Sequence, residues 1–382
     1  MGAVDVTGAA GVRSTFRGTA LRTDFAFVRF SMGLWPSPRP ARKDIVNVSP
    51  IRARTALAIG AAVLLSGCAA PAEPAAGRTG AAAPSGHYPV TLDVVDDAGG
   101  KLTQTVEKRP GRVVVIGQAL AELMIEFGLE DRIVGVGYLD NSYSAYADRI
   151  EKLPKISDQL PSKEAILERR PDLVLTMSFA LKPDKIGEVP FWNARGVRVL
   201  PSVNYTVGRD LDSYYEDVRH VGEVFGVTRR TGAYIEEQRA RIAAVAQTAR
   251  KAGDAPTVLL VASGGRDTYD YYSPSLGLVD EMVNGAGGTY MELTRDTYAQ
   301  LSLESIVAAN PDKIVVTEFQ KSDAEKSRNR LLRDPRLKSV TAIRNGDVMT
   351  ADYTTSIRGS LALADLCEKI AAFVHPDLFP AS

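Results

Sequence analysis

Two segments repeat one pattern of residues at a constant distance along the chain: Ser162-Lys-Glu164-Ala-Ile166 with Pro171-Asp172-Leu-Val174, and Ser302-Leu-Glu304-Ser-Ile306 with Pro311-Asp312-Lys-Ile314. Phe179 and Phe319 keep the same offset without a gap. Each copy predicts a helix that begins at a serine cap, a turn at Pro-Asp and a buried strand. The repeat therefore predicts two halves of similar structure.

Apolar runs that fit buried strands alternate with helical segments around both copies of the repeat. The run Arg112-Val-Val-Val-Ile116 is followed by a helical segment at 119–127 and by the strand-like Ile133-Val-Gly-Val136, and the alternation begins again at 257–262. This alternation is typical of parallel βαβ units. We predict an α/β fold of two Rossmann-like lobes with parallel sheets, preceded by a β-hairpin at 90–106.

The stretch at 211–251 has a helical composition. It contains no proline and no strand-like run, and residues 229–251 are rich in Ala, Arg, Glu and Gln. A helix of this length extends roughly 35 Å and could cross a small domain. We predict that a single long helix joins the lobes as a stiff strut, with an N-terminal lobe at 88–208, an inter-lobe helical segment at 209–252 and a C-terminal lobe at 253–382.

The segment 51–68 has the order of a secretory signal. Arg52 and Arg54 precede an apolar stretch that is too short to span a bilayer, and Leu65-Ser66-Gly67-Cys68 resembles a bacterial lipobox. We expect cleavage before Cys68, lipidation of that cysteine, and an extracytoplasmic protein anchored to the cell membrane. Residues 69–87, rich in Ala, Pro and Gly, predict a flexible tether. Residues 1–50 would make the signal's positive region far too long, so we expect them to be a non-native or mis-assigned extension.

The composition argues against several classes of function. Lys plus Arg and Asp plus Glu both number 46, which leaves no basic excess for nucleic acid. The three histidines, His87, His220 and His375, suggest no metal site, and Cys367 lies in an apolar helical run as a small buried hydrophobe. Phosphate-cradling and nucleophile-elbow motifs are missing from the sequence. We expect a binding protein without cofactor, and keep an α/β enzyme or a surface receptor domain as less favoured alternatives.

The ligand of a two-lobed α/β clamp binds between the lobes, at loops beyond the carboxyl ends of the strands. Most of the 14 tyrosines fall in these loops. Tyrosine offers apolar area with a hydroxyl group, and arginine offers a fixed planar charge, which suits a large anionic ligand or a metal chelate. Arg266 and Arg358 have no obvious acidic partner nearby in the sequence. The candidate ligand-binding residues are Tyr138, Tyr143, Tyr205, Arg266, Tyr272, Arg295, Tyr353 and Arg358.

Several motifs together resemble one family. They are Arg112-Val-Val-Val with Glu122-Leu and Gly128, Arg132-Ile-Val-Gly-Val, both Ser-x-Glu repeats with Pro-Asp, and Asn345-Gly-Asp-Val. Over about Val90 to Phe379 the chain resembles the ABC-importer solute-binding proteins for iron-siderophores, haem and cobalamin, whose lobes are bridged by one long helix. The resemblance implies a monomer that captures a ferric siderophore for iron uptake, with haem or cobalamin as alternatives.

In this family a surface glutamate on each lobe docks with arginines of the dimeric permease. The positions that match this role are Glu164 and Glu304, one in each copy of the repeat. The resemblance therefore implies a permease dimer as the protein partner, with the two glutamates as its docking points. A purely local role in helix capping is the alternative for both residues.

Overall fold

The computed structural model describes residues 87–380 except 141–143, 206–209, 264, 266, 275–277, 295, 297 and 319–323, and only the backbone of Tyr205 and Ser263. These residues belong to one compact unit, 78–382. The predicted extension at 1–50, the signal segment with Cys68, and the tether up to residue 86 lie outside the described residues. Among the described helices, none combines the length and apolar character needed to cross a membrane.

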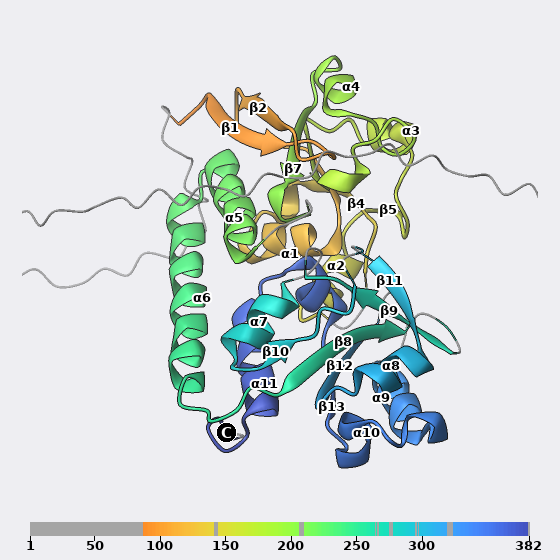
Figure 1. The fold of residues 1–382 in the computed structure, drawn as a ribbon. Coiled ribbons are helices and arrows are strands. Elements are labelled where there is room, and N and C mark those ends of the chain that lie inside the picture. Colours follow the sequence, from red (N-terminus) through yellow and green to blue (C-terminus); the bar gives the residue numbers. More distant parts are fainter. Residues whose placement is uncertain are drawn as a thin grey trace, which may run out of the picture. The chain divides into compact units, whose positions relative to one another are not determined.

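The first sheet contains only parallel strands, in the order β5-β4-β3-β6-β7. Its central strands β3 and β6 are buried at every residue because helices cover the sheet (Figure 1). An antiparallel hairpin, β1 with β2, precedes it as predicted. The strands are β1 (Val90–Val95), β2 (Lys101–Val106), β3 (Val113–Ile116), β4 (Ile133–Gly137), β5 (Lys155–Ser157), β6 (Leu173–Met177) and β7 (Arg198–Ser202). The helices are α1 (Gln118–Glu126), α2 (Ala147–Glu151), α3 (Lys163–Glu168) and α4 (Val189–Asn193), with short 3-10 turns η1 (Glu130–Arg132), η2 (Ser178–Ala180) and η3 (Val203–Tyr205).

The second sheet has the order β11-β9-β8-β12-β13, with β10 paired to the start of β8. Strands β8, β10, β12 and β13 are parallel, which confirms the α/β class. Its strands are β8 (Thr257–Ser263), β9 (Thr268–Tyr272), β10 (Thr289–Tyr290), β11 (Tyr298–Ser302), β12 (Lys313–Thr317) and β13 (Val348–Thr350). Its helices are α7 (Val279–Gly285), α8 (Leu303–Ala309), α9 (Ala324–Arg333), α10 (Thr341–Asn345) and α11 (Leu363–Val374), with the 3-10 turn η4 (Pro335–Leu337) and the π-turn η5 (Thr354–Arg358).

Strands β9 and β11 correct one detail of the prediction, because both are antiparallel to their neighbours. Thr268–Tyr272 is a strand and not a cleft loop, and its burial alternates along the chain. The physical reason lies in β8: β10 pairs only with its first two residues, so its last residues accept the returning strand β9. The added hairpin carries Tyr272 and Tyr298 on neighbouring strands.

The two copies of the repeat fold alike. The hydroxyls of Ser162 and Ser302 each accept a hydrogen bond of 3.2 Å from the backbone N–H three residues later, which confirms both serine caps. The Asp172 carboxylate accepts the N–H of Arg112, at 3.0 Å, just before β3. The Asp312 carboxylate accepts the N–H of Thr257, at 2.9 Å, at the start of β8. Each aspartate therefore fastens the beginning of the central strand of its own sheet.

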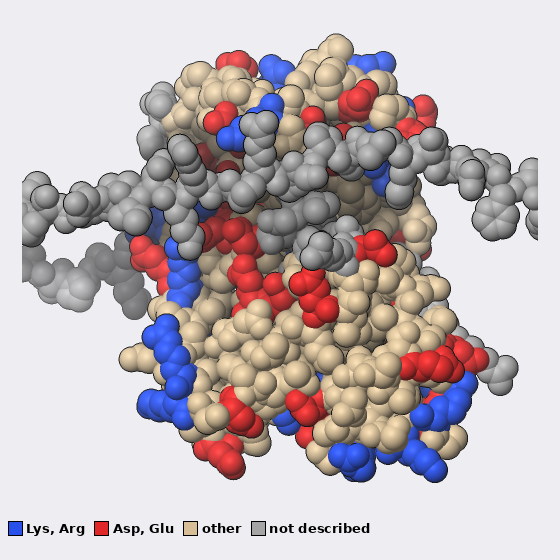
Figure 2. All heavy atoms as spheres, in the orientation of Figure 1, with Lys and Arg blue, Asp and Glu red and all other residues tan. Residues whose placement is uncertain are grey.

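The predicted inter-lobe segment forms two helices, α5 (Leu211–Phe225) and α6 (Thr228–Ala249). The break is at Gly226, whose φ of 66° lies in the left-handed region that glycine favours. Helix α6 has 22 residues, or about 33 Å, and packs against α5, α7 and α11. Lys and Arg side chains follow its outer edge, on the left of Figure 2. The lobe boundaries themselves stay a prediction.

Gly222 makes the contact between α5 and α6 close. A Cβ there would lie 2.2 Å from Thr231 Oγ1 and 3.3 Å from the Thr228 Cα. We expect Gly222→Ala to lower the free energy of unfolding by about 2 kcal/mol, measured by urea denaturation. Gly232→Ala in α6 is the control, because nothing lies within 4 Å of its Cβ position. A Gly222→Ala variant as stable as the Gly232→Ala variant would contradict this packing.

Candidate ligand cleft

Arg358 contacts groups from both sheets. It ends η5, after β13 of the second sheet, and its Nε lies 3.7 Å from Oδ1 of Asp140, which follows β4 of the first sheet. The Asn204 amide, beyond β7, donates a hydrogen bond to the Arg358 carbonyl oxygen. The guanidinium carbon lies 5.9 Å from the ring centre of Phe179 and 5.4 Å from that of Tyr353. The loops beyond the strands of both sheets therefore meet at this arginine.

Asp140 is an acidic partner of Arg358 that lies far from it in the sequence. The Asp140 side chain is fully buried, and the Thr354 hydroxyl donates to its Oδ2 at 3.4 Å. Burial raises the pKa of Asp140 to about 6, although the charge of Arg358 acts in the opposite direction. At neutral pH the carboxylate offsets much of the arginine's charge.

Aromatic rings surround the ion pair. The hydroxyls of Tyr272 and Tyr353 lie 3.1 Å apart, and their rings meet edge to face at 6.0 Å. Tyr272 also meets Tyr298 at 5.6 Å, and Tyr138 meets Phe179 at 5.8 Å, again edge to face. Tyr353 is only 2% exposed, whereas Tyr298 is 48% exposed. Tyr353 is therefore a buried packing residue of the cluster, and the ring of Tyr298 is accessible to solvent.

Two buried acids hold the loops of the first sheet. The Asp217 carboxylate in α5 accepts hydrogen bonds from the Ser202 hydroxyl and from the backbone N–H groups of Val203 and Asn204, which positions Asn204 beside Arg358. The Gln118 amide donates to Glu122 at 3.1 Å, and its oxygen accepts the Asp140 N–H at 3.1 Å. Burial raises the pKa of both acids to about 7.

The structure brings four predicted ligand residues together: Tyr138, Tyr272, Tyr353 and Arg358. Tyr143, Arg266 and Arg295 lie outside the described residues, and for Tyr205 only the backbone is described, next to Asn204. The sequence placed Asp140, Phe179 and Tyr298 in the loops of the ligand site, but they were not among the candidate ligand residues. The sequence signal for Asp140 was a position just after a strand, and Phe179 had that position together with its place in the internal repeat.

No cluster of three or more His, Cys, Asp or Glu side chains suited to a metal ion occurs in the described ranges. His375 Nε2 lies 3.1 Å from the Gly287 carbonyl oxygen, and His220 Nε2 lies 3.8 Å from Glu216. Cys367 is buried in α11, and burial raises the pKa of its thiol to about 12. This thiol stays protonated at neutral pH and matches the prediction of a small buried hydrophobe.

Glu164 and Glu304 occupy the same position in the two copies of the repeat. Each is exposed in the first turn of its helix, α3 or α8. For each glutamate, a hydrogen bond from its own backbone N–H, and then one from the serine two residues earlier, lowers the pKa of the carboxyl. Both side chains are therefore ionised and accessible, one on each half of the molecule.

The two α/β sheets and the loops that meet between them define a two-lobed solute-binding protein. The chain belongs to the periplasmic binding protein family, whose model matches residues 113–354. A relative from Bacillus subtilis (strain 168), the uncharacterized ABC transporter substrate-binding lipoprotein YvrC, is 25% identical over 323 residues, covering 84% of this chain and 95% of the relative. A cobalamin-binding protein of Halobacterium salinarum is 26% identical over 220 residues, 55% of either chain.

A solved structure has the same fold. The periplasmic binding protein from Veillonella parvula DSM 2008 matches with a TM-score of 0.65 and 22% identity, over 77% of this chain and 94% of that one. This likeness shows the fold, and the family model makes the chain a periplasmic binding protein. The proteins from Bacillus, Halobacterium and Veillonella are all named as binding proteins.

Proposed function

We propose that the protein captures a ferric siderophore between its two lobes and delivers it to an ABC permease. The observation that carries this proposal is the Arg358–Asp140 pair within a wall of tyrosines. Because Asp140 offsets the arginine, the described part of the cleft suits a large chelate with little net charge, held by ring contacts and hydroxyl hydrogen bonds. A ferric trihydroxamate has this chemistry, since three singly charged hydroxamates cancel the charge of Fe3+.

Cobalamin is the second candidate. It is favoured by the similarity to the cobalamin-binding protein of Halobacterium salinarum. Its large ring system would also offer contact area to these tyrosines, and their neighbouring arginine is already paired. Haem joins the test panel because the sequence left it open.

The proposal includes location and partners. The signal at 51–68 and its lipobox support an extracytoplasmic protein anchored through lipidated Cys68. The ionised, exposed Glu164 and Glu304 would meet the two halves of a permease dimer, because equivalent charges on two similar lobes suit a two-fold partner. The binding protein itself would act as a monomer.

Ligand titration tests the proposal. The protein's intrinsic fluorescence is followed while ferric hydroxamates, ferric catecholates, haem and cobalamin are added. We expect submicromolar quenching by a ferric hydroxamate and a loss of affinity of about tenfold or more in Tyr272→Ala, which removes the ring between Tyr353 and Tyr298.

Tyr88→Ala is the matched control. Its hydroxyl donates to the Val224 carbonyl oxygen at the end of α5, outside the aromatic cluster, so ligand affinity should stay unchanged. Quenching by cobalamin alone would show that cobalamin, and not a ferric siderophore, is the ligand. Absence of quenching by every compound of the panel would contradict the proposed class of ligand.

A further inference from the structure

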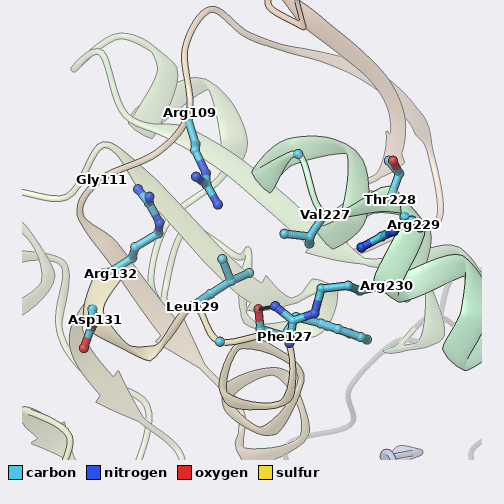
Figure 3. A pocket seen from close by; sticks show the side chains of 12 residues that line it. Arg109, Gly111, Phe127, Leu129, Asp131, Arg132, Val227, Thr228, Arg229 and Arg230 are labelled. Atoms are coloured by element: carbon cyan, nitrogen blue, oxygen red, sulfur yellow. Dashed lines mark hydrogen bonds between the residues drawn. The ribbon is translucent and has the colours of Figure 1, made fainter. Parts of the chain in front are cut away.

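A pocket with a volume of about 990 Å³ lies between the first sheet and the start of α6. Four arginines line it: Arg109 and Arg132 come from the segments that lead into β3 and β4, and Arg229 and Arg230 come from the first turn of α6. Asp131 is the only acidic residue among the described residues that line it. Figure 3 shows the side chains of Arg109 and Arg132 directed toward each other and that of Arg229 on the opposite side.

Two of these arginines, Arg132 and Arg230, form hydrogen bonds with the backbone. Arg230 donates to the carbonyl oxygens of Phe127, at 2.6 Å, and Glu126, at 3.2 Å, at the carboxyl end of α1. Arg132 donates to the Pro110 carbonyl oxygen at 2.7 Å. These bonds fix both cations at the pocket, whatever else binds there.

Arg109 and Arg229 have hydrogen-bonding capacity to spare. The Nε of Arg109 is buried and has no hydrogen-bond partner among the described residues. Arg229 is exposed, in the first turn of a 22-residue helix that has no acidic residue there and no side-chain cap. Burial and, after it, the like charge of Arg109 lower the pKa of Arg132, so the cations are held close despite their repulsion. An anion in the pocket would relieve that repulsion.

We propose that this pocket is a second binding site, separate from the cleft, for a phosphate group. Guanidinium groups bind phosphate through charge-assisted hydrogen bonds, and the positive end of α6 adds to the attraction. The first described residues of the chain lie next to this pocket. His87 Nε2 lies 2.5 Å from the Glu223 carbonyl oxygen, and the Tyr88 hydroxyl donates to the Val224 carbonyl oxygen. Both carbonyl groups come just before Gly226, which lines the pocket.

The phosphate could be a lipid headgroup or a free anion. The lipid source rests on the proposed anchor. The tether that the sequence predicts at 69–87 would have an average reach of about 24 Å, which would keep the pocket close to the bilayer. Binding of a free phosphate needs no anchor. The arms of one experiment separate these sources.

The experiment uses the full chain with Cys68→Ser, which cannot be acylated. Inorganic phosphate and pyrophosphate are titrated by calorimetry, and sedimentation measures binding to phosphatidylglycerol vesicles and to pure phosphatidylcholine vesicles. We expect Arg109→Gln with Arg229→Gln to weaken binding by about tenfold or more, since each lost charged hydrogen bond is worth about that factor. Binding of vesicles alone identifies a headgroup site, and binding of dissolved phosphate as well identifies a general anion site.

The matched control is Arg250→Gln with Lys251→Gln, which removes the same charge at the far end of α6. It should change binding by less than about twofold. Absence of binding in the parent chain, or an equal loss in both pairs, would overturn the proposal. Should the first pair not fold, Arg229→Glu alone tests the site, because this side chain is exposed. The same variants are also titrated with the siderophore, and their siderophore affinity should stay unchanged. The test of the phosphate site then does not depend on whether the proposed ligand of the cleft is correct.

Discussion

Arg358→Leu should lower the free energy of unfolding by about 3 kcal/mol at pH 8, because it leaves the fully buried Asp140 carboxylate without its cation. The loss should shrink as the pH falls. Burial already raises the pKa of Asp140 to about 6 in the folded chain, above the ordinary value of 3.8, and removing Arg358 raises it further. The folded state then takes up a proton that relieves the penalty, so stability increases as the pH falls through the raised pKa.

Urea denaturation between pH 5 and pH 8 measures this effect. The control is the double variant Arg358→Leu with Asp140→Asn, which removes both charges and should recover most of the stability at pH 8. A loss that is the same at both pH values, or a double variant no more stable than Arg358→Leu, would show that the pair is not electrostatically coupled. The cleft contacts would then act through packing alone.

Reversing the charges at the two equivalent helix starts, Glu164→Arg with Glu304→Arg, should reduce import by about tenfold or more while ligand affinity stays unchanged. Both carboxylates are exposed and their pKa values are lowered, so both are ionised when a permease is met. If arginines of the permease receive them, the variant brings like charges together. Uptake of the titrated chelate by cells and fluorescence titration of the purified protein give the two readouts.

The control for charge alone is Glu236→Arg with Glu237→Arg on α6, where both side chains are exposed. It alters the net charge equally and should import normally. If the Glu164 and Glu304 variant imports normally, these residues do not dock with the permease and their role is local helix capping. The stability cost of losing a carboxylate from a first turn is only about 0.3–1 kcal/mol, too small to mimic a transport defect through unfolding.

The sequence predicted the features that depend on neighbouring residues. Serine caps, buried strands and the helical character of 228–249 are local, and the structure has all of them. Strand β9 was missed because its Thr-Tyr-Asp-Tyr-Tyr sequence has no apolar run, and its place follows from the unpaired end of β8. The Asp140–Arg358 pair joins loops 218 residues apart, and no local pattern specifies such a meeting. The arginine pocket likewise draws on three separate segments.

The fastening of each central strand by its own aspartate bears on how the chain arose. The bond from Asp172 to the residue before β3 closes 60 residues, and the bond from Asp312 to the start of β8 closes 55. In each half, the aspartate and the strand that it holds belong to the same half, so neither half depends on the other for this hydrogen bond. Two copies of one ancestral unit would have this arrangement. The antiparallel pair β9 and β11 has no counterpart in the first sheet, whose strands are all parallel, and it carries Tyr272 and Tyr298.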